Sequence, residues 1–327
     1  MRAAFSFRYL VFVAGMAVFG WLIFSAPAAA TDTLRAPAQS TPAPGNRIFL
    51  PLVGRDFVNI PWLNHLNSYR SQAGLPPLIE NASWSNGAAL HARYMVKTDQ
   101  VTDYQLVVNP EYTPEGAEAA RHSLLFGTAA VTTTDEAAMD IWLRSPFQAV
   151  SVLDPELRRT GFGSYREADG GAVQMAAALD VQRGWSDAPA PTYPVFWPGN
   201  GQTVRLRTYS GGDYPDPLRH PGCVGAQGLP IILQVGNGSL NVGLAASNPT
   251  LLRVGGTPLP HCAFTETTYD GGNSTDTTYG RLLLGTRDAI VLLPKDPLTP
   301  GVTYTVTINA TLNGVPQTYT WSFTVAP

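Results

Sequence analysis

Apolar residues in the first folded part of the chain recur at the three-to-four-residue spacing of amphipathic helices. This spacing predicts a helix through 62–73 that ends at Gly74, and a second helix over 84–96 with Ser83 as its N-cap. Residues 98–113 lack such a spacing and are predicted to form a loop.

Two shorter helices are predicted after this loop. Pro114 suits a first helical position, and Glu115 and Glu118 would favour the positive end of the helix dipole. Thr133 has the capping-box spacing to Glu136 ahead of a helix over 137–143. Pro146 is then predicted to break that helix.

Strand patterns follow the helices. Residues 160–165 and 173–181 are rich in small, branched or aromatic residues and are joined by a predicted turn at 169–171. Helices followed by strands imply a sheet that is covered by helices. The first fold class that the sequence predicts is therefore α+β.

The pattern changes after a Pro- and Ala-rich linker, which we place at 188–194 within the run DAPAPTYP. Short apolar runs then alternate with Gly and Pro turns, and no helical spacing is apparent, which predicts an all-β sandwich over 195–327. Residues of the last two strands would share one buried face: Tyr304, Val306, Ile308, Trp321 and Phe323. The predicted strands of this part are 203–208, 231–235, 282–284, 289–293, 302–310 and 317–325.

The N-terminus has the pattern of an export signal. Arg2 and Arg8 precede an apolar run at 9–24, and small residues at 28–30 suit cleavage after residue 30. An uncleaved membrane anchor is the alternative, and the protein would contact a membrane through this segment only in that case. In both cases residues 31–46 form a linker, and the folded part is expected to be secreted or on the cell surface.

Composition narrows the function classes. A net charge of −3 with 14% charged residues offers no basic surface, so nucleic acid is not an expected partner. The 2 cysteines, Cys223 and Cys262, suit one disulfide in an exported protein. Because His220 and His261 lie beside them, a Cys/His metal site is the alternative.

Several short motifs together resemble the CAP domain (SCP/PR-1-like, cysteine-rich secretory protein superfamily) in its bacterial form. They are WLNHLNSYRSQAGLPPL, ALHARYM, YTPEGAEAARHS and IWLRSPFQAVSVLDPELRRTGFGSY. The resemblance implies an α-β-α sandwich over 47–187. The C-terminal ending, with PLTPGVTYTVTINA and YTWSFTV, resembles bacterial Ig-like domains.

The CAP resemblance also implies a groove that in many members holds two His and two Glu. In this chain Asp103 and Gln148 fall where His is expected, and Glu115, Glu118 and His122 lie near the expected carboxylates. A neutral Gln and a hard Asp oxygen suit Zn²⁺ poorly, so no tight metal site and no cofactor are expected, although a weak divalent-metal site stays open. His91 is expected to be a hydrogen-bonded structural residue.

Two functions remain open on this basis. The favoured one is an extracellular binding or adhesion module with a degenerate groove, whose partner is a protein, a lipid or cell-envelope material. The alternative is an extracellular peptidase-like hydrolase that uses the groove carboxylates or a weak metal site. No G-x-S-x-G or H-E-x-x-H motif is present, so the sequence favours binding over catalysis.

Overall fold

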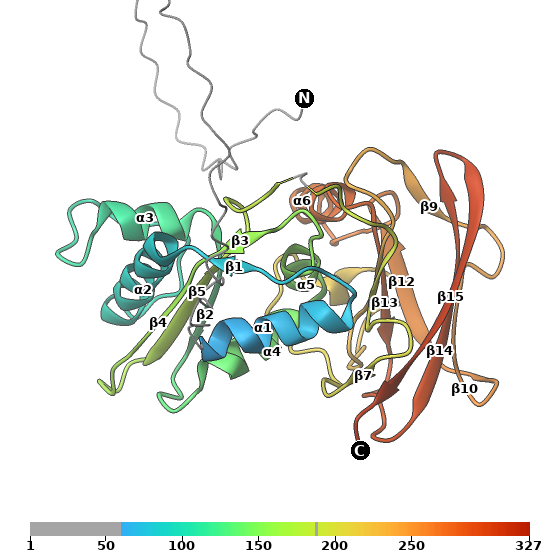
Figure 1. Cartoon of the computed structure of the whole chain (residues 1–327), viewed down its shortest axis with the longest axis horizontal. Coiled ribbons are helices and arrows are strands. Elements are labelled where there is room, and N and C mark those ends of the chain that lie inside the picture. The colour runs from blue at the N-terminus through green and yellow to red at the C-terminus, as the bar shows by residue number, and fades with distance from the viewer. Residues whose placement is uncertain (1–59, 187–188) are drawn as a thin grey trace, which may run out of the picture. The chain divides into compact units, whose positions relative to one another are not determined.

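The computed structural model describes residues 60–186 and 189–327 (Figure 1). The predicted signal peptide at 1–30, the linker at 31–46 and the first residues of the predicted CAP domain lie outside this part. Across the two described ranges, no helix combines the length and apolar character needed to cross a membrane.

The N-terminal half is mostly helical and begins and ends its helices near the predicted positions. Helix α4 ends before Pro146, as predicted, and Pro146 is the first residue of a further helix, α5, which was not predicted. The helices are α1 (Pro61–Gln72), α2 (Ala82–Lys97), α3 (Pro114–Ala120), α4 (Asp135–Leu143) and α5 (Pro146–Val152).

The N-caps of two helices differ from the prediction by one or two residues. Asn81, not Ser83, caps α2, because its side-chain oxygen accepts the N–H groups of Ser83 at 3.1 Å and Trp84 at 3.4 Å. Thr134, not Thr133, caps α4 by accepting the N–H of Ala137 at 3.2 Å. The free N–H groups at a helix start bond to whichever nearby side-chain oxygen is best placed. An Asn or Thr one or two positions away can therefore replace the predicted cap.

A three-stranded antiparallel sheet separates two helical layers in the order β2 (Ser123–Thr128), β5 (Met175–Asp180), β4 (Phe162–Arg166). On β4, Phe162 packs on Trp62 of α1 with ring centroids 5.3 Å apart, whereas the neighbouring Gly163 lies against α2. Figure 1 shows α2 and α3 on one side of the sheet and α1, α4 and α5 on the other. The predicted β4 and β5 are confirmed, whereas β2 was not predicted.

Two sheets form most of the C-terminal half. One has the strand order β11-β10-β14-β15-β7, with β9 also pairing β14, and the other has the order β12-β13-β8-β6. The predicted buried face of the last two strands, Tyr304 to Phe323, is confirmed. The strands are β6 (Val195–Trp197), β7 (Thr203–Val204), β8 (Ile231–Gln234), β9 (Val242–Leu244), β10 (Thr250–Val254), β11 (Thr257–Pro258), β12 (His261–Thr265), β13 (Ala289–Pro294), β14 (Thr303–Leu312) and β15 (Val315–Val325). A further parallel pair, β1 (Ile79–Glu80) with β3 (Arg159–Thr160), lies in the N-terminal half.

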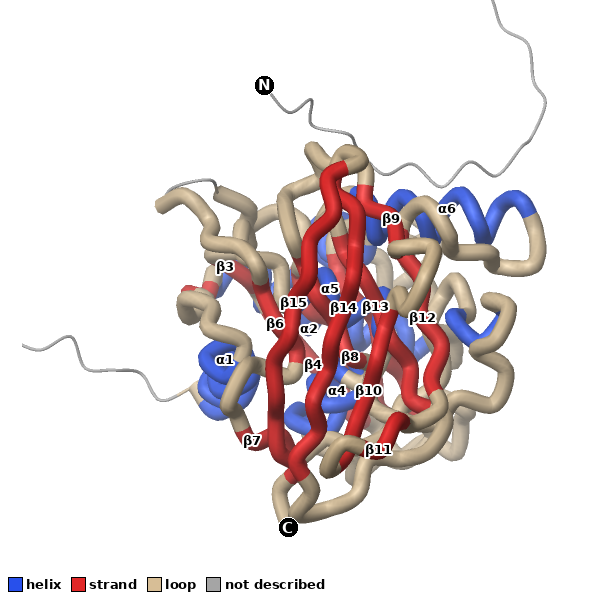
Figure 2. Tube along the Cα trace, turned by 90° about the vertical axis from the view of Figure 1, so that its right-hand side faces the viewer, coloured by secondary structure: helices blue, strands red, loops and turns tan. Residues whose placement is uncertain are grey.

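The prediction that this half is entirely β is wrong at one place. Residues 282–284, expected to be a strand, belong to helix α6 (Ser274–Gly285), which Asn273 caps through the N–H of Asp276 at 2.9 Å (Figure 2). A short 3₁₀ turn, Pro217–Arg219, is also present.

One continuous hydrophobic core joins the two halves. Tyr69 of α1 meets Trp197 of β6 edge to face at 5.7 Å, and Phe147 of α5 lies 5.9 Å from Phe264 of β12. These rings belong to a single buried cluster that extends from Trp62 to Val325. The domain limits 47–187 and 195–327 stay a prediction. The described parts of these two predicted domains pack together as one compact unit.

Candidate functional site

The loop between α2 and α3 carries Asp103, which is half-buried. Beside it, the fully buried His91 donates from Nε2 to the carbonyl oxygen of Thr102 at 2.7 Å, and its Nδ1 accepts from Gln105 at 3.2 Å. Burial lowers the pKa of His91 to about 4, although the hydrogen bond to Thr102 opposes this shift. His91 is therefore a neutral structural residue, as expected, and supports the loop that holds Asp103.

Helix α3 and the residues that follow it bring two predicted site residues together. Glu118 forms a salt bridge with Arg121 and lies 3.5 Å from Nδ1 of His122, which donates to the carbonyl oxygen of Glu118 at 2.8 Å. Burial raises the pKa of Glu118, but the hydrogen bond from Arg121 and the nearby charges outweigh it and the net shift is downward. Glu115 is exposed in the first turn of α3. The Glu118 carboxylate is thus held ionised by local partners.

Gln148 lies in the first turn of α5, on the helical layer opposite α2 and α3 (Figure 1). Its side-chain Oε1 is buried without a hydrogen-bond partner among the described residues. The residue before it, Phe147, donates its N–H to Oδ2 of Asp213 in the C-terminal half at 3.3 Å. The helix that carries Gln148 is therefore held by the C-terminal half.

Of the five predicted site residues, the structure pairs Glu118 with His122. Glu115 lies on the same helix but is exposed in its first turn, Asp103 lies in the loop before α3, and Gln148 lies on α5. Over 60–186 and 189–327, no group of three or more His, Cys, Asp or Glu side chains is arranged to hold a metal ion. The chemistry that this arrangement supports is therefore a carboxylate–imidazole pair with a neighbouring guanidinium, at the end of α3.

A polar cluster that the sequence did not reveal lies where the two halves meet. Asp213 is 7% exposed, and its Oδ1 has no hydrogen-bond partner in the described part of the chain. Burial raises its pKa well above the ordinary value, and the charge of Asp216 adds to the shift. Nearby, the hydroxyl groups of Ser145 and Ser210 are 2.6 Å apart.

Only a weak local signal could have revealed this cluster. Asp213 follows two glycines in a loop, and its partner Phe147 precedes it by 66 residues in sequence. Both Gly211 and Gly212 have a φ of 77°, a backbone conformation that glycine adopts without strain. A Gly-Gly-Asp turn indicates a loop but does not indicate its partner.

The two cysteines are joined. Cys223 and Cys262 form a disulfide with a Cα–Cα distance of 5.2 Å, so the expectation of one bridge is confirmed and the Cys/His metal alternative is wrong. His261 instead contacts Thr250 Oγ1 at 2.9 Å and the carbonyl oxygen of Leu259 at 2.8 Å.

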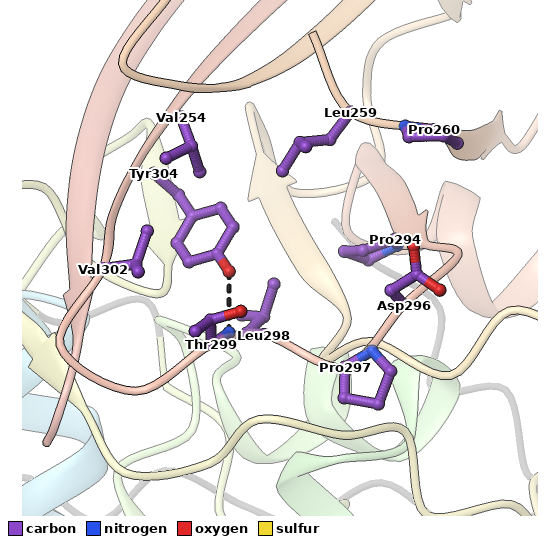
Figure 3. Close-up of a pocket in the computed structure, with 10 residues that line it drawn as sticks. All are labelled: Val254, Leu259, Pro260, Pro294, Asp296, Pro297, Leu298, Thr299, Val302 and Tyr304. Carbon is purple, nitrogen blue, oxygen red and sulfur yellow. Dashed lines mark hydrogen bonds between the residues drawn. The ribbon is translucent and has the colours of Figure 1, made fainter. Parts of the chain in front are cut away.

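A mainly apolar pocket of about 270 Å³ opens in the C-terminal half (Figure 3). Its residues lie between Val254 and Tyr304, and Asp296 is the charged residue of the lining. The hydroxyl oxygen of Tyr304 accepts the N–H of Thr299 at 2.7 Å. None of the predicted site residues lines this pocket.

One protein-family model matches part of the N-terminal half. Residues 63–177 match the model of the cysteine-rich secretory protein family, CAP. Among solved structures, the chain is similar to an extracellular protein containing a SCP domain from Bacillus anthracis str. Ames, with 15% sequence identity and a TM-score of 0.29. That match covers 37% of this chain and 39% of the other. No curated protein matches. The family match supports a CAP domain over residues 63–177.

Proposed function

We propose that the protein is exported and acts outside the cytoplasm as a binding or adhesion module, in which a CAP domain with a degenerate groove is fixed to a C-terminal Ig-like half. The observation that carries the proposal is the state of the groove residues. Glu118 is tied to Arg121 and His122, and the helix with Gln148 is held by Asp213. Side chains held in such local contacts are better suited to form part of a fixed binding surface than to transfer protons in catalysis.

The disulfide and the export pattern of the N-terminus support an extracytoplasmic location. We place the partner among proteins, lipids and cell-envelope material. The Ig-like half would be a rigid extension of the CAP surface, because the two halves share one core.

Binding without turnover is the outcome that tests this proposal. The full chain is incubated with phospholipid vesicles, cell-wall polysaccharide and extracellular protein, each immobilised separately. We expect saturable binding to one of these materials, while mass spectrometry shows that the bound material is chemically unchanged.

The hydrolase alternative makes a different prediction for the same preparations. Peptide or ester cleavage that is lost in Asp103→Asn and Glu118→Gln would contradict the binding proposal. Glu136→Gln is the matched control, because Glu136 lies in the first turn of α4, where a carboxylate interacts with the helix dipole.

Metal binding offers an independent measurement. We expect Zn²⁺ to bind the full chain more weakly than micromolar, because Gln148 is a neutral ligand and Glu118 is already paired with Arg121. Isothermal titration that shows a micromolar or tighter site, weakened by His122→Asn, would contradict the degenerate groove.

A further inference from the structure

The loop between α2 and α3 exposes a run of large apolar side chains. Val107 is 73% exposed and Val108 is 92% exposed, and Leu106 and Tyr104 are each 53% exposed. In Figure 1 this loop projects beyond the two helices that it connects. Single exposed apolar residues are ordinary, but three consecutive ones at a projecting tip indicate a surface that meets an apolar partner.

Hydrogen bonds anchor the base of the loop to α2 and to the start of α3. Gln105 is 8% exposed, contacts His91 at 3.2 Å, and accepts the N–H of Thr113 at 2.9 Å. Directly after it, the N–H of Leu106 donates to the hydroxyl of Tyr94 at 3.0 Å. The apolar tip is therefore presented in a preorganised form, which lowers the entropic cost of binding.

Backbone hydrogen bonds close the loop at Leu106 and beyond it. The N–H of Asn109 donates to the carbonyl oxygen of Leu106 at 2.9 Å, and the N–H of Tyr112 donates to that of Asn109 at 3.0 Å. The side chain of Asn109 also accepts the N–H of Glu111 at 2.9 Å. In the described part of the chain, no backbone hydrogen bond involves Val107 or Val108, so their N–H and C=O groups suit the hydrated interfacial region rather than the hydrocarbon core of a bilayer.

The charge pattern also favours a lipid partner. No charged residue lies between Asp103 and Glu111, and Glu111 forms a salt bridge with Arg93 at 2.8 Å. Tyr104 and Tyr112 flank the aliphatic tip, and tyrosine rings are suited to the boundary between lipid and water. Because the two nearest charges are acidic, a zwitterionic surface fits better than an anionic one.

We propose that residues 104–108 insert into the interfacial region of a zwitterionic lipid bilayer. This inference rests on the proposed binding role and names the partner of one surface of the domain, away from the candidate groove. The chain also begins with an apolar segment at 9–24. If that segment is retained, the residues between 30 and 60 span at most about 100 Å, which keeps the loop within reach of the same membrane.

Site-specific labelling tests the proposal on the full chain. Because the native cysteines are joined in a disulfide, Val108→Cys adds the only free thiol, which takes a polarity-sensitive fluorophore. Val315→Cys is the matched control, since Val315 is also exposed, at 56%, but belongs to β15. The vesicles are phosphatidylcholine that contains brominated lipids.

We expect the label at 108 to shift to shorter wavelength and to be quenched by the brominated lipids, whereas the label at 315 stays in water. Replacing both Val107 and Val108 with Asp should weaken vesicle binding by about tenfold or more without changing the unfolding temperature, because both side chains are exposed. Binding through residues 9–24 would not produce the shift at 108, so the label decides the outcome.

Two results would overturn the proposal. In the first, the chain binds vesicles while the label at 108 stays as exposed to water as the label at 315; the binding role then stands, but the loop is not its lipid contact. In the second, Val108→Cys chains crosslink to each other without lipid, which would make the loop a contact between two copies. Failure to bind any envelope material would instead remove the proposed function itself.

Discussion

At the scale of single residues, the buried carboxyl of Asp213 links stability to pH. Its pKa is raised in the folded state, so the folded chain binds the proton more tightly than the unfolded chain does. The contribution of Asp213 to stability is then fully present at low pH and is lost as pH rises above the unfolded pKa, near 3.9, by about 1.4 kcal/mol for each unit of upward shift. Asp213→Asn should therefore raise the unfolding temperature at pH 7 and leave it unchanged near pH 3.5, as calorimetry can show. A lower unfolding temperature at pH 7 would contradict this account.

The stability contribution of His91 depends on pH in the opposite direction. Its pKa falls to about 4 on folding, so its contribution is fully present above the unfolded pKa of about 6.5 and is lost as pH falls from 6.5 to 4. The complete loss amounts to about 3 kcal/mol. His91→Gln, whose amide can still donate to Thr102, should flatten this part of the stability profile in urea titrations. Glu115→Gln is the control, because Glu115 is exposed; an unchanged slope in His91→Gln would refute the assignment.

Local chemistry made some of these residues predictable. A histidine within an apolar helix face predicts a buried, hydrogen-bonded ring, and His91 confirms it. The partners of the buried Arg70 were less predictable, because its guanidinium donates to the carbonyl oxygens of Pro76, Val152, Asp154 and Leu157, which lie in segments far apart in sequence. The burial of Asp213 could not be predicted, because its hydrogen-bond partner Phe147 lies at a helix start 66 residues earlier.

At the scale of elements, the start of α2 separates two neighbouring candidates for the same cap. The side chain of Asn81 accepts two N–H groups, whereas Ser83 contributes only its backbone N–H to the cap. Asn81→Ala should therefore lower the free energy of unfolding by about 1 kcal/mol, and Ser83→Ala should change it by less than about 0.5 kcal/mol. Chemical denaturation of both variants measures the difference. Equal effects would indicate that the cap is shared.

The missed elements lacked the patterns on which sequence predictions depend. The sequence of β2, SLLFGT, does not alternate between apolar and polar residues, and in the structure every one of its residues is half-buried. In α6, Gly280 and Leu284 are the buried residues, and threonines and glycines occupy many of the other positions. A helix with so little buried surface has no apolar stripe, and its runs of Leu and Thr favour a strand. Packing against β12 and β13, rather than local preference, explains this helix.

At the scale of the whole molecule, buried aromatic contacts and a buried ion pair join the two halves. Besides the aromatic rings, Arg287 pairs with Asp154 at 3.1 Å, and both side chains are less than 10% exposed. Removing one partner of a buried pair leaves an uncompensated charge and typically costs about 3–5 kcal/mol. Arg287→Leu should lower the unfolding temperature of the full chain strongly, and a double variant that also carries Asp154→Leu should recover part of it. Additive losses in the double variant would show that the two side chains do not interact.

The shared core also determines how far the effect of the disulfide extends. Cys223 and Cys262 are 39 residues apart, and opening a loop of this length costs about 4 kcal/mol on the chain-entropy account. Replacing both cysteines with serine should lower the free energy of unfolding by about this amount. Because Phe147 of α5 packs on Phe264 of β12, close to Cys262, we expect amides of α4 and α5 to lose hydrogen-exchange protection together with those of β8 and β13. Leu282→Ala, at a residue 47% exposed, is the control and should change stability by less than about 0.5 kcal/mol. If only amides of the C-terminal half lost protection, the two halves would unfold as separate cooperative units despite their shared core.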